Sequence, residues 1–141
     1  MNVTPLGAAL RALLLSDPNV EAAVSERVVP GALEAGCALP ALVYQRTGGE
    51  PGQEHDGLAG YEQADVQLDA WAWTDEQAEA LGVAARSVLV ERSPGWRFGS
   101  VAIDSIAVQR DRGCMRDAGD KTDDRPAWRY SFDVVVGFTR L

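Results

Sequence analysis

Cysteine and histidine are both scarce in this sequence. The chain contains two cysteines, Cys37 and Cys114, and a single histidine, His55. Neither cysteine belongs to a C-x-x-C pair and no cluster of histidine and cysteine surrounds them, which argues against a zinc site. We therefore expect two free thiols in a reducing cytoplasm. No glycine-rich stretch has the lysine and the strand-to-helix setting of a phosphate-binding loop, so we predict neither a metal nor a cofactor.

Positive charge and long apolar runs are also lacking. Lysine and arginine number 13 against 21 aspartates and glutamates, which gives a net charge of -8. This balance argues against a protein that binds nucleic acid or an anionic membrane, since both depend on basic side chains. An acidic protein is still suited to let DNA slide past without adhering. No apolar run approaches the roughly 20 residues of a membrane span, and Arg11 interrupts the apolar N-terminal segment, which is untypical of a signal peptide.

What the sequence does have is an ordinary supply of core-forming residues. It is 141 residues long, and 46% of them are hydrophobic. That length and content predict one globular domain, residues 1–141, whose core is large enough to fold without disulfides or metals.

The stretch Glu62–Trp73 has the clearest pattern in the chain. Small and aliphatic residues alternate with polar ones, and the apolar positions are Ala64, Val66, Leu68, Ala70 and Ala72. Alternation with period two predicts a strand with one buried and one polar face. The segment from Asp75 to about Glu91 follows with helical spacing, and Thr74 with Gln77 has the spacing of a capping box. We expect this helix to pack against the face of small residues.

The N-terminal segment is predicted to be helical. Thr4 is expected to be its N-cap, with Pro5 at the first helical position. The apolar stripe that follows has helical spacing and consists of Leu6, Leu10, Leu13 and Leu14. Asp17 and Pro18 are expected to end this helix and to begin a short second one.

Three further segments complete the predicted sheet. Ala41–Thr47 and Trp128–Thr139 have the pattern of half-buried strands. Trp96 to about Gln109 contains a strand in which the apolar positions shift by one residue between Ile103 and Ile106. A bulge is the natural cause of such a shift.

The remaining segments are expected to be connections. Val28–Gly31 is a brief extended piece, while Gly48–Gly60 and Arg110–Pro126 are predicted to be loops. The strands are half-buried and mostly joined without crossover helices. We therefore predict an α+β fold, with a mixed or antiparallel sheet of about four strands and helices packed on one face.

Candidate catalytic residues are few. His55 lies beside Glu54 and Asp56, which is a setting a general base can have. A solvated loop histidine is the better explanation, because a loop this rich in glycine rarely holds a side chain in the precise position that catalysis needs. Asp65 and Asp69 are four residues apart on a strand, too far to share a metal or a proton without a third partner. We predict no catalytic residues and no enzymatic activity.

Candidate contact residues are easier to name. Trp71 and Trp73 stand on the polar face of their strand, and large exposed aromatic side chains mark contact surfaces. The alternative is that the N-terminal helix or a loop covers them. The charged segment after Gln109 is either a disordered surface loop or a segment that becomes ordered only in contact with another subunit. From it we take as interface candidates Arg110, Arg112, Met115, Arg116 and Lys121.

Several stretches resemble a known family. They are RVVPG (Arg27–Gly31), LPALVYQRTGGEP (Leu39–Pro51) and QLDAWAWT (Gln67–Thr74), the last one directly before a helix. Together, over roughly Leu6–Leu89, they resemble the tail-completion or tail-terminator proteins of long-tailed bacteriophages and gene transfer agents. The C-terminal part is similar only in general form, as a hairpin that ends in alternating aromatic residues.

The resemblance implies a virion structural protein of the tail or neck, made in the bacterial host cytoplasm. Members of the family form a homo-oligomeric ring, usually a hexamer, that caps the tail tube. The partners implied are the major tail tube protein and the head-side connector or stopper protein. DNA would pass through the bore without specific binding, and no membrane is involved.

Two other functions remain open from the sequence. The first is a different phage neck protein, such as a head-completion or stopper protein. The second is a small monomeric enzyme or ligand-binding module built around His55, which would show a ligand-dependent shift in melting temperature.

Overall fold

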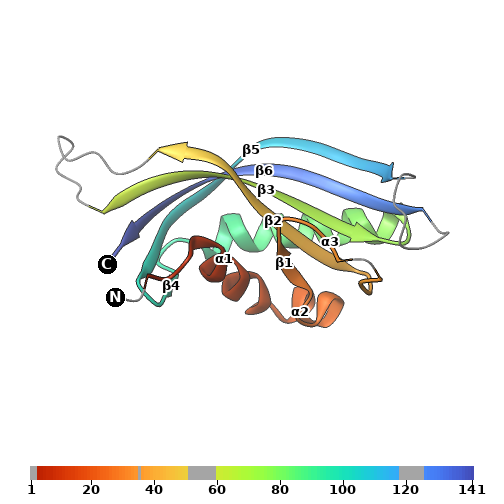
Figure 1. The fold of residues 1–141 in the computed structure, drawn as a ribbon, viewed down its shortest axis with the longest axis horizontal. Coiled ribbons are helices and arrows are strands. Elements are labelled where there is room, and N and C mark those ends of the chain that lie inside the picture. Colours follow the sequence, from red (N-terminus) through yellow and green to blue (C-terminus); the bar gives the residue numbers. More distant parts are fainter. Residues whose placement is uncertain (1–2, 35, 51–59, 118–125) are drawn as a thin grey trace.

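The computed structural model describes residues 3–34, 36–50, 60–117 and 126–141, and it contains three helices and six strands (Figure 1). In chain order these are α1 (Leu6–Leu15), α2 (Pro18–Val24), β1 (Val28–Pro30), β2 (Ala41–Glu50), β3 (Tyr61–Ala72), α3 (Asp75–Arg92), β4 (Arg97–Phe98), β5 (Val101–Asp117) and β6 (Ala127–Arg140). No helix in these described ranges is long and apolar enough to span a membrane.

The strands form one mixed sheet in the order β1-β2-β3-β6-β5-β4. β1 pairs with β2 in parallel, and every other neighbouring pair is antiparallel. The helices lie together on one face of this curled sheet, below it in Figure 1. The predicted α+β class is therefore confirmed, but the sheet has six strands instead of about four. The two additional strands, β1 and β4, are three and two residues long, which is too short for alternation to reveal them.

The alternation in β3 places its small side chains in the core, as predicted. Ala64, Val66, Leu68, Ala70 and Ala72 are all buried, and α3 packs over them with its own buried small residues. Gly82 of α3 shows how close this packing is. A Cβ atom on Gly82 would lie 2.2 Å from Cδ1 of Tyr130 in β6, so the helix can approach the sheet only because this position has no side chain.

The predicted start of α3 is confirmed, whereas the predicted start of α1 is wrong. The Thr74 hydroxyl accepts a hydrogen bond from the Gln77 amide at 3.2 Å, which satisfies one free N–H at the helix start. Thr4 does not cap α1. Its hydroxyl accepts from the Ser100 amide at 2.9 Å, and its own amide donates to the Ser100 hydroxyl at 3.2 Å. Thr4 is thus tied to the turn before β5, a contact that local sequence does not reveal.

The second helix begins as predicted. Pro18 is its first residue, and the Asp17 carboxylate accepts hydrogen bonds from the amides of Asn19 and Val20 at 3.1 and 3.0 Å. Asp17 is buried, and it also lies 3.1 Å from the Arg92 guanidinium at the end of α3. The same carboxylate therefore starts α2 and ties it to α3.

Strand β2 is longer than predicted. It continues through Gly48 and Gly49 to Glu50, where the sequence suggested a loop. The register of β2 against β3 shifts between Arg46 and Gly48, so Thr47 is an extra residue. A bulge of this kind breaks the alternation and hides the continuation of a strand.

Strand β5 shows the same effect on a larger scale. It extends to Asp117, so the prediction of a loop from Arg110 onward is wrong for residues 110–117. Three register shifts interrupt its pairing with β6, at Ile103/Ser105, Val108/Arg110 and Asp111/Gly113. The first of these confirms the predicted bulge. The other two, together with the charged side chains that are common on edge strands, remove any visible alternation.

Candidate interaction surface

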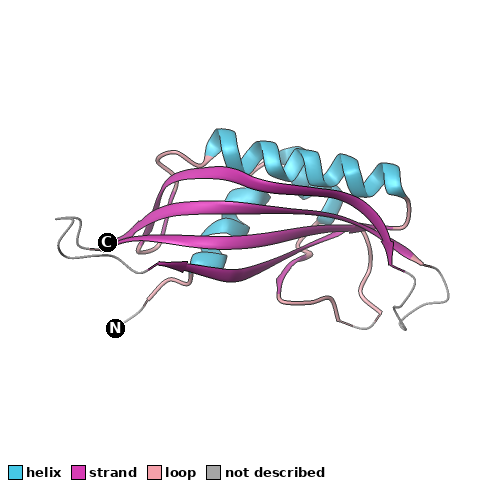
Figure 2. Cartoon of the chain, turned by 90° about the horizontal axis from the view of Figure 1, so that it is seen from above, coloured by secondary structure: helices cyan, strands magenta, loops and turns pink. Residues whose placement is uncertain are grey.

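In the part of the chain that the structure describes, one face of the sheet carries no helix, and we call it the open face (Figures 1 and 2). The strand register shows which residues share this face. Trp71 of β3 is level with Arg129 of β6, and Arg129 is level with Met115 of β5. Two of the predicted contact residues, Trp71 and Met115, therefore belong to one row across three strands, with an arginine between them.

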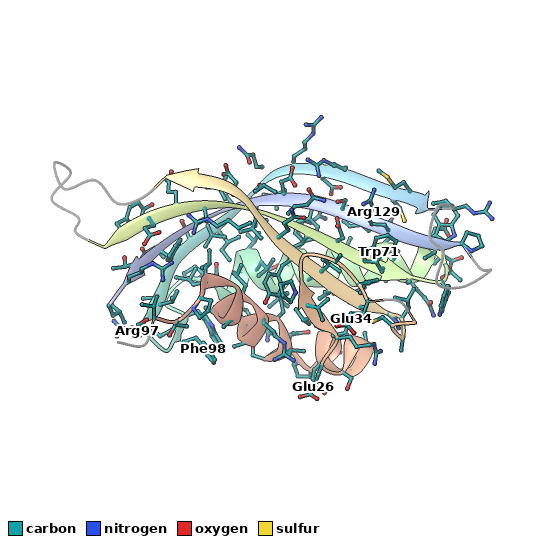
Figure 3. The ribbon with its side chains drawn as sticks, in the orientation of Figure 1. Glu26, Glu34, Trp71, Arg97, Phe98 and Arg129 are labelled. Atoms are coloured by element: carbon teal, nitrogen blue, oxygen red, sulfur yellow. The ribbon has the colours of Figure 1, made fainter. Side chains whose placement is uncertain are left out.

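The three side chains of this row are in contact. The guanidinium carbon of Arg129 lies 5.5 Å from the centre of the Trp71 ring, which is a cation–π distance. The other end of the guanidinium donates from Nη2 to the Met115 sulfur at 3.2 Å. Trp71 and Arg129 are both labelled in Figure 3. We refer to Trp71, Arg129 and Met115 as the aromatic row.

Sequence reasoning missed Arg129. The only local indication of a surface role was its position on the polar face of the last predicted strand. Trp128 and Tyr130 lie on the other face. The helix proposed as one possible cover for Trp71 does not cover it, because α1 lies on the other face of the sheet. Trp73 follows the end of β3 and is half-buried.

A polar cluster lies next to the aromatic row on the open face. The Ser131 hydroxyl donates to Oδ1 of Asp69, and Nε2 of Gln67 donates to the same oxygen at 3.2 Å. Ser131 is buried despite being polar, so this cluster is part of the folded sheet. These hydrogen bonds satisfy the Asp69 carboxylate and tie β3, which also carries Trp71, to Ser131 of β6.

Two predicted contact arginines lie at the β5 border of this face. Arg112 forms a salt bridge of 2.8 Å with Asp133, whose side chain is only 16% exposed. The second carboxylate oxygen of Asp133 is buried and has no hydrogen-bond partner among the described residues. Arg110 is level with Asp133 across β5 and β6 and is exposed.

The remaining predicted residues are not part of this group. Arg116 is exposed and pairs with Trp128, which lies on the face of β6 that packs against the helices. Lys121 lies outside the described residues, as do His55, Glu54 and Asp56. Among the described residues, no group of histidine, cysteine, aspartate or glutamate is arranged to hold a metal ion. Cys37 and Cys114 are both free thiols.

A second polar cluster joins α3 to β5 on the helix side. The Tyr130 hydroxyl donates to Oδ2 of Asp111, and Nη1 of Arg86 donates to the same carboxylate oxygen and, at 3.0 Å, to the Tyr130 oxygen. Burial, followed by the hydrogen bond to Asp111, raises the pKa of Tyr130 to about 12. The bond from Tyr130 is the largest cause that lowers the pKa of Asp111 below its usual value. This network fastens the bulged strand β5 to the helix layer.

The cysteine beside this network is not activated. Burial raises the pKa of the Cys114 thiol, and the carboxylates of Asp75 and Glu79 raise it further. A thiol held in its protonated form is a poor nucleophile and a poor metal ligand. The chemistry of this region is therefore structural, and the open face remains the stronger candidate surface.

Comparison with known proteins identifies the family. Residues 8–132 match the sequence pattern of the family described as tail completion protein gp17. The chain belongs to this family. The match covers most of the chain, and it confirms the resemblance first seen in the short stretches between Arg27 and Thr74.

A solved structure has the same fold as this tail completion protein. It is a chain from the virion of a native gene transfer agent particle, with a TM-score of 0.62 and 16% sequence identity, and 94% of each chain is covered. Identity this low supports the fold alone, so the role in a virion tail rests on the family match.

A curated relative matches over a much shorter stretch. An ethyl acetate hydrolase of Pseudomonas putida is 41% identical over 54 residues, which is 38% of this chain. The chain spans 17% of the length of that hydrolase. So short a match does not place the chain in the hydrolase's family. Membership of the tail completion family makes the chain a structural protein of a phage-type virion tail, in agreement with the predicted structural role.

Proposed function

We propose that this tail completion protein is a tail terminator, which forms a homo-oligomeric ring that caps the tail tube and joins it to the head-side connector. The observation that carries the proposal is the match of residues 8–132 to the tail completion family. Such a protein works by geometry and not by chemistry. One face of the ring is complementary to the last ring of the tube, and the other face cannot be extended by further tube subunits.

The open face supports this function because it presents preformed contact residues. The aromatic row is held by a cation–π contact and a contact to sulfur, so its side chains are already ordered before a partner arrives. Aromatic and arginine side chains carry much of the binding energy at protein interfaces, and preordered ones lose less entropy on binding. We assign the aromatic row to contacts with the major tail tube protein.

The charge of the chain supports a ring through which DNA passes. A net charge of -8 per subunit becomes a strongly acidic assembly when several copies gather. Like charge suppresses adhesion to phosphate, so DNA can slide through the bore during packaging and ejection. In this proposal the subunits are made in the bacterial host cytoplasm and join the virion during tail assembly.

The first experiment is light scattering of the purified protein over a concentration series, with negative-stain images of the same samples. A hexameric ring with an open bore is the expected species, either alone or after addition of purified tail tubes. A protein that remains monomeric and does not bind tube ends would contradict the terminator function. Binding to purified connectors but not to tubes would instead favour a head-completion or stopper protein.

A further inference from the structure

At each border of the sheet, part of a long strand has no pairing partner on its outer side among the described residues. On one side, β1 covers only Leu42–Tyr44 of β2, so Gln45–Glu50 has no described neighbour on that edge. On the other side, β4 covers only Val101 and Ala102 of β5. Next to them, the Ile103 amide donates to the Trp96 carbonyl and the Ile103 carbonyl accepts from the Gly95 amide. From Asp104 onward, β5 pairs with no described strand other than β6. Unpaired N–H and C=O groups on such an edge are a template for a strand from another chain.

The directions of the two edge strands are compatible with each other. β2 runs antiparallel to β3, β3 to β6, and β6 to β5, so β2 and β5 run in opposite directions. A rotation about an axis roughly parallel to the strands keeps each strand's direction. β5 of one copy would therefore meet β2 of a rotated copy in antiparallel orientation. If the rotation angle between neighbouring copies divides a full turn into equal parts, repeating the same head-to-tail contact produces a closed ring.

The unpaired stretches also lie at the same height in the sheet. Following the register across β3 and β6, Gln45 is level with Arg110 and Glu50 is level with Ser105. In a neighbouring copy related by this rotation, Ser105–Arg110 of β5 would therefore lie at the same height as the open stretch of β2. Each stretch contains one bulge, which discourages pairing with unrelated strands.

Apolar groups at the two edges are complementary. A pocket of about 470 Å³ lies beside the open edge of β2, on the helix side of the sheet. Its lining is mostly apolar and includes Leu6, Leu10, Pro30, Tyr44 and Val66. On β5, Val108 is level with the buried Val134, so it belongs to the helix side, yet it is 39% exposed. In a continuous sheet, Val108 of one copy would cover the pocket of the next.

Charges at the two edges are complementary as well. Arg110 and Arg116 are exposed on β5, and no described residue forms an ion pair with either. At the opposite border, the exposed Glu26 and Glu34 precede and follow β1 (Figure 3), again without an ion-pair partner in the described ranges. Opposite charges across a contact favour the correct pairing and suppress wrong ones.

From these observations we infer that β5 of one copy pairs with the Gln45–Glu50 stretch of β2 in the next copy. The partner is a second copy of this chain, and the contact is antiparallel and head-to-tail. It extends one sheet around the ring and buries Val108 in the neighbour's pocket. This inference rests on the proposed ring and names the surfaces that build it.

The first test compares two lysine substitutions at equally exposed valines. Val108→Lys places a charge on the edge, and Val83→Lys places the same charge on the outer side of α3, where the valine is 41% exposed. Both positions are exposed enough for the variants to fold, which circular dichroism will check. We expect Val108→Lys to weaken assembly about tenfold or more, as loss of a buried contact at an interface does. Val83→Lys is expected to assemble like the wild type.

The second test is a disulfide that only neighbouring copies can form. Arg46→Cys and Val108→Cys are introduced together after Cys37→Ser and Cys114→Ser. Within one copy β3 and β6 separate these positions, so they are three strand spacings of about 4.8 Å apart. That exceeds the roughly 7 Å limit between the Cα atoms of a disulfide. Mild oxidation should give a ladder of covalent multimers that reduction collapses, and neither single-cysteine variant should give a ladder.

The outcomes separate the edge contact from the ring itself. If rings form and Val108→Lys forms them equally well, with no disulfide ladder, the edge contact is wrong and the ring remains. If the wild type stays monomeric with and without tail tubes, both the ring and the edge contact are wrong. Weakened assembly of Val108→Lys alone, together with a disulfide ladder, supports the edge contact.

Discussion

Arg129 lies over the ring of Trp71, with 5.5 Å between the guanidinium carbon and the ring centre. The two residues are directly opposite each other in the pairing of β3 with β6, on the face that no helix covers. The contact holds a large aromatic side chain in place where a partner can reach it. It thereby links the strand register, which is a folding property, to the surface that we propose contacts the tail tube.

The first prediction concerns this pair. A double-mutant cycle with Trp71→Leu and Arg129→Gln should give a coupling of about 0.5–1 kcal/mol in the free energy of unfolding, as for a partly exposed cation–π contact. Urea unfolding of the wild type, both single variants and the double variant measures it. Additive effects of the two substitutions would show that the contact contributes nothing to stability.

The second prediction concerns the function of the same face. Trp71→Ala should weaken binding to purified tube ends about tenfold or more, because aromatic anchors dominate interface energies. Gln63→Ala is the matched control, since Gln63 lies on the same face of β3 but away from the aromatic row. Sedimentation with tail tubes compares the two variants. Equal loss or equal retention of binding would argue against the aromatic row as the tube contact.

The third prediction concerns the pH dependence of stability. The pKa of Tyr130 is raised to about 12 from an ordinary 10.0, so the unfolded chain loses this proton first as pH rises. The contribution of Tyr130 is therefore complete below about pH 10 and is lost between pH 10 and 12. Tyr130→Phe should cost about 1 kcal/mol at pH 7 through its lost hydrogen bonds.

The measurement for Tyr130 is a difference between two pH profiles. Urea unfolding of wild type and Tyr130→Phe is compared from pH 7 to 12, so that other groups titrating in this range cancel. The gap between the two curves should close as pH rises above 10. A gap that stays constant to pH 12 would contradict the assigned hydrogen bond from Tyr130 to Asp111.

The fourth prediction concerns the packing of α3 on the sheet. Gly82→Ala would normally favour a helix by about 1 kcal/mol. Here the new methyl group would lie 2.2 Å from the Tyr130 ring, so overpacking should outweigh that gain and lower stability by about 1–3 kcal/mol net. The double variant Gly82→Ala with Tyr130→Leu should recover part of this loss relative to Tyr130→Leu alone. Thermal unfolding of the four proteins measures both effects.

Much of the fold could be predicted because the relevant signals are local. The alternation in Glu62–Trp73 identified a strand and its buried face, and the five apolar positions from Ala64 to Ala72 are buried as expected. The spacing of Thr74 and Gln77 identified the start of α3. Short-range patterns of this kind act within one turn of helix or one strand, so neighbouring residues alone report them.

The candidate site could be predicted only in part. Trp71 was a contact candidate because it is aromatic and lies on a polar strand face, and Met115 because it lies in the charged segment after Gln109. Nothing local related the two residues to each other. Arg129 joins them because β3, β5 and β6 adopt one particular register. Register depends on pairing between distant segments, and bulges in β5 shift it further.

The sequence by itself determined the fold class, the buried face of β3, the long helix above it and the resemblance to tail completion proteins. The tertiary structure decided the length of β2 and β5, the tie between Thr4 and Ser100, and the assembly of the aromatic row. The physical reason is the range of the interactions. Periodicity and capping are written in adjacent residues, whereas strand edges, bulges and rows of side chains exist only once separate strands have paired.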